Sequence, residues 1–375
     1  MTNRREDARL ISSIGILAAL FLAPLARAQT VKITPNGART GEYCARDRAL
    51  LFEDPTEVRI LYDPGITVAG GGDTRLGEVD AILVSHNHFD HIGYQRLTQN
   101  PDDPNAICGV PPQTTRTGNT TTAEIAAVKN SAVLVNGNMA QFLSRKIENI
   151  RGVPTPACYS PQIEGPGPSE TVVPRPSPCT GGLAFGSSRT VTRAAGTPGV
   201  RINVVTALHS DGIFNPKLLF TAPLGGYMDD NLLTGYDGLA NGFVLTFTNG
   251  LTVYLTGDIG PTSDMETIVR RFYHPNLAVA NMDGVSNMGP EEAAFAMIKL
   301  VKPAAVIPSH AEEAVTTNGQ VSPDSRTAKF IGLLEDMPAY VPLSGKTMEF
   351  DGDANCVGGP GCPQAAVGRR WIRGR

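Results

Sequence analysis

The stretch VSHNHFDHIG, Val84 to Gly93, places three of the chain's six histidines within six residues, around one aspartate. The apolar run DAILVS (80–85) leads into it and is typical of a buried strand. The loop after that strand then carries His86, His88, Asp90 and His91. Ligands bind at the C-terminal ends of strands in open α/β sheets. The spacing therefore predicts a metal site, with two imidazoles turned toward one ion, and the aspartate and third imidazole toward a second.

Further candidate ligands follow other predicted strands. His209 follows INVVTAL (202–208), Asp258 follows LTVYLTG (251–257) and His310 follows AAVIPS (304–309). Because each stands where a strand ends, we expect all three side chains to reach the same edge of the fold as the first loop. The sixth histidine, His274, follows a helical pattern and precedes a proline, so we interpret it as structural or surface.

The remaining pattern indicates an α/β chain with mixed sheets. Further strand-like runs are EVRILYD (57–63), SAVLV (131–135), FVLTF (243–247) and LAVAN (277–281). Helical patterns cover about 137–147, 263–272 and 290–302. The runs at 243 and 251 are joined by Thr248-Asn249-Gly250, and Asn-Gly is a strong hairpin signal.

The chain's 375 residues, with 40 Gly and 29 Pro, predict one loop-rich domain over residues 29–375. Three segments without clean periodicity are interpreted as insertions, around 100–122, 154–200 and 210–241. Loops that long either take part in function or decorate the surface.

The first 28 residues have the pattern of an export signal. Arginines precede an apolar run, residues 11–25, and Ala26-Arg27-Ala28 has the small-x-small form of a cleavage site. The run is shorter than the roughly 18 to 20 residues that span a bilayer. We therefore expect residues 1–28 to be a signal peptide, the mature protein to be periplasmic or secreted, and no stable membrane insertion after cleavage. The oligomeric state is left open.

Charge and cysteine content agree with that location. Without residues 1–28, which contain four basic and two acidic side chains, the chain has 28 basic and 34 acidic groups, a formal charge of −6. This argues against nucleic acid as a partner, despite a basic tail at 368–375. Six cysteines in an exported chain favour disulfide bonds, and the most local pairs are Cys158–Cys179 and Cys356–Cys362.

HNHFDH, the histidine of TALHSDG, the YLTGD segment and the IPSH segment, in that order, resemble the metallo-β-lactamase superfamily. The segments GFVLTFTNGLTVYLTGDIG and NMGPEEAAFAMIKLVKPAAVIPSH are similar to the branch of small hydrolases that contains bacterial ascorbate-phosphate lactonases. The resemblance implies an αββα sandwich, here with long loop insertions. It also implies two divalent metal ions, for which zinc suits the His and carboxylate ligands, with manganese or iron as alternatives.

Carried over residue by residue, the family's roles distribute the ligands over two positions. The first ion would be held by His86, His88 and His209; the second by Asp90, His91 and His310; and Asp258 would bridge the two. Asp63, in YDPG, would brace the metal loop. In such a site a hydroxide shared by the two ions would attack the substrate. We expect Asp90 and Asp258, the two carboxylates that hold these ions, to be catalytic.

Particular residues narrow the class of reaction. Redox di-iron members of the superfamily carry glutamate where this chain has His88, and true β-lactamases generally lack the aspartate found here as Asp258. The favoured function is hydrolysis of a small ester or lactone. A phosphodiesterase and an exported metal-binding protein without catalysis are the alternatives. Candidate substrate contacts in the third insertion are Asp211, Tyr227, Asp229, Asp230 and Asn231.

Overall fold

Two β-sheets packed face to face form the centre of the protein in a computed structural model, which describes residues 29–109, 112–158, 171–172, 177–209 and 238–363. The eight-stranded sheet has the order β19-β18-β1-β2-β3-β4-β7-β9 and the seven-stranded sheet the order β15-β14-β13-β12-β11-β10-β8. Both sheets are mixed, because β3, β4, β7 and β9 are parallel, as are β13, β14 and β15, while most other neighbours are antiparallel.

The strands of the eight-stranded sheet are β1 Val31–Pro35, β2 Leu50–Glu53, β3 Arg59–Tyr62, β4 Ala81–Leu83, β7 Ala132–Asn136, β9 Cys179–Leu183, β18 Met348–Phe350 and β19 Cys356–Gly358. Those of the seven-stranded sheet are β8 Thr171–Val172, β10 Ser188–Val191, β11 Val200–Thr206, β12 Asn241–Thr246, β13 Thr252–Leu255, β14 Leu277–Asn281 and β15 Ala305–Ser309. Two short hairpins pair β5 Gln95–Leu97 with β6 Thr114–Arg116, and β16 Thr316–Thr317 with β17 Gln320–Val321.

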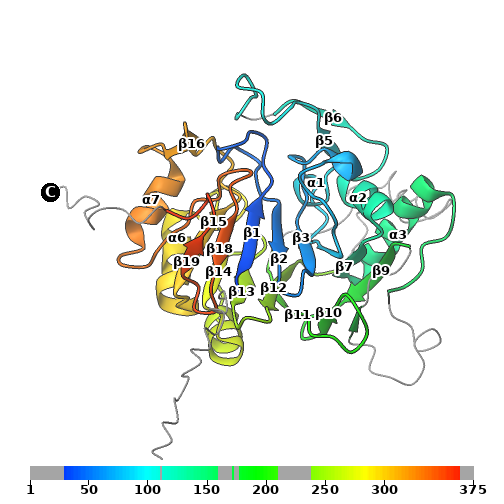
Figure 1. Ribbon diagram of the computed structural model, residues 1–375. Coiled ribbons are helices and arrows are strands. Elements are labelled where there is room, and N and C mark those ends of the chain that lie inside the picture. Colours follow the sequence, from blue (N-terminus) through cyan, green and yellow to red (C-terminus); the bar gives the residue numbers. More distant parts are fainter. Residues whose placement is uncertain (1–28, 110–111, 159–170, 173–176, 210–237, 364–375) are drawn as a thin grey trace, which may run out of the picture.

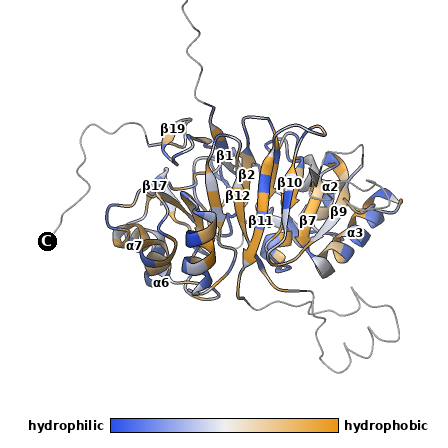
Figure 2. Cartoon of the chain, turned by 90° about the horizontal axis from the view of Figure 1, so that it is seen from below, coloured by the Kyte–Doolittle hydropathy of each residue, from blue (hydrophilic) through white to orange (hydrophobic). Residues whose placement is uncertain are grey.

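The helices are η1 Gly70–Gly72, α1 Phe89–Ile92, α2 Thr121–Lys129, α3 Gly137–Arg151, η3 Met265–Tyr273, α6 Pro290–Phe295, η4 Ala296–Val301 and α7 Arg326–Leu333. They form two outer layers, with α2 and α3 at one end of the molecule and α6 and α7 at the other (Figure 1, Figure 2). Among the described residues, no helix combines the length and apolar character needed to cross a membrane.

Three hydrophobic clusters hold these layers together. Between the sheets, Phe52 of β2 and Phe243 of β12 belong to one buried cluster. A second cluster joins the eight-stranded sheet to α2 and α3 and includes Phe142, and a third joins the seven-stranded sheet to η3, η4 and α7 and includes Phe330. Hydrophobic colouring is accordingly concentrated on the strands between the helix layers (Figure 2). The expected αββα sandwich is therefore the observed fold.

The predicted elements appear close to their expected places. Every predicted strand is present, for example 277–281 as β14 and 243–247 as β12, and the Asn249-Gly250 hairpin joins β12 to β13 with Gly250 at φ 96°. The pattern over 290–302 became two consecutive helices, α6 and η4. The helix predicted over 137–147 extends to Arg151, where Gly152 ends it in the left-handed conformation.

The segment 154–200 differs from its interpretation as a single insertion. It contains β9, which pairs with β7 in one sheet, and β10, which pairs with β11 in the other. The sequence pattern did not predict these strands, because their residues are mostly small or polar. Cys179–Leu183, for example, reads CTGGL and lacks the β-branched or aromatic run that marks a strand. The predicted signal peptide 1–28, the basic tail and the five candidate substrate contacts of the third insertion lie outside the described residues.

Three disulfide bonds link all six cysteines: Cys44–Cys108, Cys158–Cys179 and Cys356–Cys362. The two local pairs are those expected from spacing. The remaining bond, Cys44–Cys108, joins the loop before β2 to the first predicted insertion across a sequence separation of 64 residues.

Candidate metal centre

The opening motif lies where its strand pattern placed it, on the turn between β4 and the short helix α1. His86 stands three residues after the end of β4, His88 is the N-cap of α1, and Asp90 and His91 lie within that helix. The helix ends at Gly93, at φ 74°, where a Cβ would collide with the Thr121 hydroxyl and the Gly65 carbonyl. Glycine is therefore required to turn the chain and bring the ligands to one point.

The three distant candidates reach the same edge from the other sheet. His209 and Asp258 each stand three residues after the end of a strand, β11 and β13, and His310 follows β15 directly. His310 has a left-handed backbone, φ 57°, which is uncommon for a non-glycine residue and is often retained at functional sites. Nε2 of His209 and of His310 lie 3.8 Å and 3.2 Å from Oδ2 of Asp258, so the rule that strand ends meet at one edge is confirmed for these residues.

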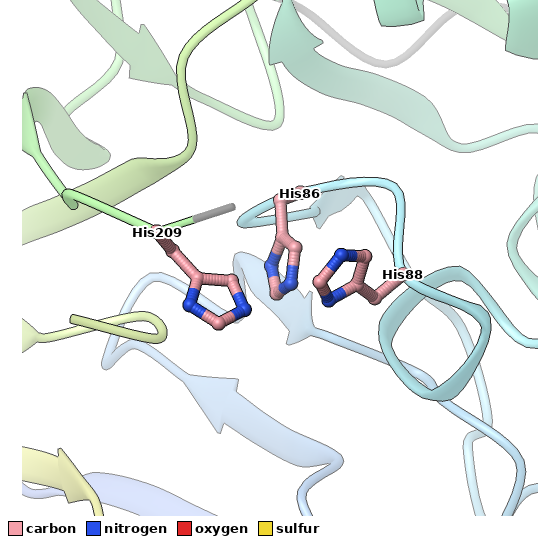
Figure 3. Close-up of side chains that lie close together, drawn as sticks. All are labelled: His86, His88 and His209. Atoms are coloured by element: carbon pink, nitrogen blue, oxygen red, sulfur yellow. The ribbon is translucent and has the colours of Figure 1, made fainter. Parts of the chain in front are cut away.

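His86, His88 and His209 form the first group. Their side chains point toward one another from two different segments of the chain (Figure 3). The ring centroids of His86 and His88 lie 4.3 Å apart, and each ring lies 5.0 Å from that of His209. One ligand atom from each residue falls within 4.8 Å of the others, which is close enough for one ion to bind all three.

Asp90, His91 and His310 form the second group. Their ligand atoms also lie within 4.8 Å of one another, and all three residues are buried. The Nε2 of His310 lies 3.6 Å from the Oδ2 of Asp90. The structure therefore brings together both ligand sets that the family resemblance implied.

Asp258 lies between the two groups. Its Oδ2 is within 4.0 Å of four imidazole nitrogens, at 3.2 Å from Nε2 of His310, 3.3 Å from His91, 3.8 Å from His209 and 4.0 Å from His86. Its other oxygen accepts a 2.9 Å hydrogen bond from the amide of Asn281, which sits at the end of β14. Asn281 thus orients a carboxylate that faces both groups.

Several of the imidazole nitrogens lack hydrogen-bond partners within the described ranges, as expected of metal ligands. Nε2 of His86, His209 and His310 is buried and has no hydrogen-bond partner among the described residues. Leaving a polar atom buried and unpaired costs about 1–3 kcal/mol, a cost that a metal bond would offset. Unpaired imidazole nitrogens converging on a buried carboxylate are the donors that a divalent ion such as zinc takes.

Burial keeps the histidines of the first group neutral. Burial, followed by the proximity of His91, lowers the pKa of His86 well below 6.5, and burial together with His209 lowers the pKa of His88 to about 4. Burial likewise lowers the pKa of His209. A neutral imidazole has a lone pair free for a metal, so these rings suit ligation at neutral pH.

His91 lies in a more negative environment. Burial by itself lowers its pKa, but the carboxylates of Asp258 and Asp63 outweigh burial and raise it to about 10. Asp63 accepts from Nδ1 of His91 at 2.8 Å, and also from the backbone N–H and the hydroxyl of Ser85. The expected bracing role of Asp63 is therefore present in the structure. The carboxylates favour a positive charge close to this ring.

The motifs did not indicate a group of charged residues beside the second set of ligands. Arg48 donates to Asp90 and to Glu312 at 2.7 Å each, and Arg46 contacts Glu312 at 2.8 Å. Glu312 could have been suspected because it stands two residues after His310. The arginines, in the loop before β2, had no sequence signal. His274, exposed after η3, lies outside both groups, as expected.

Comparison with known proteins agrees with this site. Residues 49–94, which contain the opening motif, match the family model of the metallo-β-lactamase superfamily. A UPF0173 metal-dependent hydrolase of Cupriavidus necator is 26% identical over 356 residues, covering 92% of this chain and 99% of the relative. A second, from Cupriavidus taiwanensis, is 27% identical over 275 residues, covering 73% of this chain and 72% of the relative.

Among solved structures, the metallo hydrolase Igni18 of Ignicoccus hospitalis aligns with a TM-score of 0.48 and 18% identity, covering 86% of this chain and 99% of that one. The metallo-β-lactamase fold protein YhfI of Bacillus subtilis aligns with a TM-score of 0.46 and 12% identity, over 86% and 99% of the two chains.

Proposed function

We propose that this chain, a metal-dependent hydrolase of the metallo-β-lactamase superfamily, is exported and hydrolyses a small, uncharged ester or lactone. The hydrolytic centre is the convergence of His86, His88, Asp90, His91, His209, Asp258 and His310 described above.

The charge balance beside the centre carries the choice of substrate. In the described part of the chain, Arg46 and Arg48 are the arginines that contact the ligands, and both are paired with the same two acids, Asp90 and Glu312. Both guanidinium groups are already paired with acids of the chain, so neither stands as a free cation ready to bind a phosphate group. An uncharged carbonyl compound needs no such charge. The pairing therefore favours an ester or lactone over a phosphodiester.

The donor set supports two divalent ions, one at each group, with zinc preferred and manganese or iron as alternatives. Divalent ions held there would lower the pKa of water from 15.7 toward ~7 and offset negative charge on a substrate oxygen. Asp258 would be shared, because its Oδ2 faces nitrogens of both groups. Asn281 and Asp63 would keep Asp258 and His91 in place.

The three disulfide bonds support export, since such bonds persist in oxidising compartments. We expect the full chain to be cleaved after residue 28 and recovered from the periplasm or the medium. N-terminal sequencing of the purified protein, together with fractionation of the producing cells, tests this. An uncleaved N-terminus on protein recovered from the cytoplasm would contradict it.

The substrate proposal is tested by loading the mature protein with zinc or manganese and screening lactones, aryl esters and phosphodiesters. We expect turnover of a lactone or ester that is lost in His209→Ala and retained in His274→Ala, since the second histidine is exposed and outside both groups. Activity on bis-aryl phosphates alone would favour the phosphodiesterase alternative. A fully loaded protein without turnover on any class would favour a non-catalytic metal-binding protein.

A further inference from the structure

The guanidinium of Arg48 lies within the second group of ligands. The residue comes just before β2, and its side chain is 1% exposed. Its Nη1 donates to Oδ2 of Asp90 at 2.7 Å and lies 2.9 Å from Nε2 of His91. Both atoms face the other ligands: Oδ2 of Asp90 lies 3.6 Å from Nε2 of His310, and Nε2 of His91 lies 3.3 Å from Oδ2 of Asp258.

His91 has no second atom to offer. Its Nδ1 lies 2.8 Å from the carboxylate of Asp63 and 3.0 Å from the hydroxyl of Ser85, on the side away from the centre. Nε2 is therefore the nitrogen left for a metal. A guanidinium N–H and a metal ion cannot both lie against one imidazole nitrogen, because the ring has a single lone pair there.

The first group is different. Nε2 of His86 and Nε2 of His209 are buried and have no hydrogen-bond partner among the described residues. A metal ion entering that group meets these free nitrogens. In the second group Nε2 of His310 is free in the same way, but Nε2 of His91 and Oδ2 of Asp90 lie against Arg48. The two positions are thus unequal before any ion binds.

Arg48 is held in this place by a network. Its Nη2 donates to Oε1 of Glu312 at 2.7 Å, and Oε2 of Glu312 contacts Arg46 at 2.8 Å. Arg46 in turn reaches Asp90 at 3.3 Å and lies over the ring of Phe89, 5.3 Å from its centroid. A buried cation without partners would be strongly destabilising, so this pairing is what allows a guanidinium to remain inside the centre.

We propose that Arg48 competes with the second metal ion for Asp90 and His91. The first ion binds at His86, His88 and His209, and Arg48 then supplies the positive charge at the second position. A second ion binds only when the guanidinium moves away from Asp90 and His91. The charge of Arg48 can stay paired during that movement, because its Nη2 is already bonded to Glu312. This inference rests on the metal binding of the proposed function and is independent of the substrate.

Titration of the metal-free protein with zinc, followed by calorimetry or by competition with a chromophoric chelator, tests the proposal. We expect one tight equivalent and a second at least tenfold weaker. Arg48→Met should tighten the second equivalent at least tenfold and leave the first within threefold. Arg48→Lys retains a positive charge at the position and should keep the second equivalent weak.

The identity of the tight position needs its own variants. His209→Ala should abolish the tight equivalent, whereas His310→Ala should leave it and remove the weaker one. Arg75→Met is the matched control, because Arg75 is also a largely buried arginine paired with an acid, Asp73, but outside both ligand groups. It should lower thermal stability without changing either affinity.

Arg48→Met leaves two buried acids, Asp90 and Glu312, to share the single cation of Arg46, which could unfold the chain. The double variant Arg48→Met/Glu312→Gln removes one positive and one negative charge together and keeps the count balanced. Two equivalents of equal affinity in the wild type would overturn the inference. So would an unchanged second affinity in a folded Arg48 variant. Either result leaves the hydrolase proposal standing, whereas a wild-type chain that binds no metal would reject both.

Discussion

Replacing Asp63 by asparagine tests how the centre is braced. The Asp63 carboxylate accepts three hydrogen bonds, from Nδ1 of His91 and from the hydroxyl and backbone N–H of Ser85, at 2.7–2.8 Å. Asparagine has the same shape and tolerates the positive φ of 37° at this position, but it has only one oxygen. One donor, either the ring of His91 or the backbone of Ser85, must then face an NH₂ group.

The size of the effect follows from those contacts. A hydrogen bond to a charged group contributes about 1.5–3 kcal/mol to stability, and Asp63→Asn loses at least one. Losing the partner that orients a metal-binding histidine typically weakens metal affinity about 10–100-fold. That corresponds to about 1.4–2.7 kcal/mol. The loss should fall mainly on the second equivalent, because His91 belongs to the second group.

The assay is zinc titration of the folded variant at neutral pH, beside thermal unfolding of the metal-free protein. Asp54→Asn is a matched control, because Asp54 is also buried and accepts from the backbone and hydroxyl groups of Thr56 and Thr248, but has no histidine partner within the described ranges. We expect both variants to lose stability and only Asp63→Asn to lose affinity. Wild-type affinity in Asp63→Asn, or an equal loss in Asp54→Asn, would refute the reasoning.

Three other predictions rest on the same contacts. Asp258→Asn should lower kcat by about 10²–10³-fold, because it removes the charge that faces four imidazole nitrogens; initial-rate kinetics with His274→Ala as the control measure this, and an unchanged kcat would remove its central role. Removing the metal with a chelator should lower Tm by about 4 °C, compared with protein at a free metal concentration of about 100 times Kd. Calorimetric scans with and without chelator check this, and identical Tm values would argue against ions bound at buried ligands. Cys44→Ser/Cys108→Ser should lower the free energy of unfolding by about 4 kcal/mol, from the sequence separation of 64 residues; denaturant titration measures it, and no loss would mean that the surrounding contacts already restrain the loop.

The metal ligands could be read from the chain because each signal is local. In the opening motif four ligands lie within six residues. An apolar strand precedes them, which indicates that they lie at the C-terminal end of that strand. His209, Asp258 and His310 each follow a strand by one to three residues, so the same rule found them. The local disulfides were found in the same way.

Elements that depend on distant partners were missed. The pattern did not reveal β9 or β10, whose short sequences gain their strand character from pairing with β7 and β11. It also did not reveal β18 and β19, which extend the sheet beside β1, some 300 residues away in the chain. Pairing across such separations is decided by which edges the packed core leaves free, and single-strand patterns do not contain that information.

The same division holds within the centre. Residue type and spacing along the chain specified the ligands, because a metal accepts few donor groups and strands deliver them at their ends. Only the tertiary structure shows that Arg48 enters the second group. Arg48 is 42 residues from Asp90 and 264 residues from Glu312 along the chain, and packing brings the three side chains together. Ligand identity is a chemical property of each side chain, whereas competition for a ligand depends on which neighbours tertiary contacts place beside it.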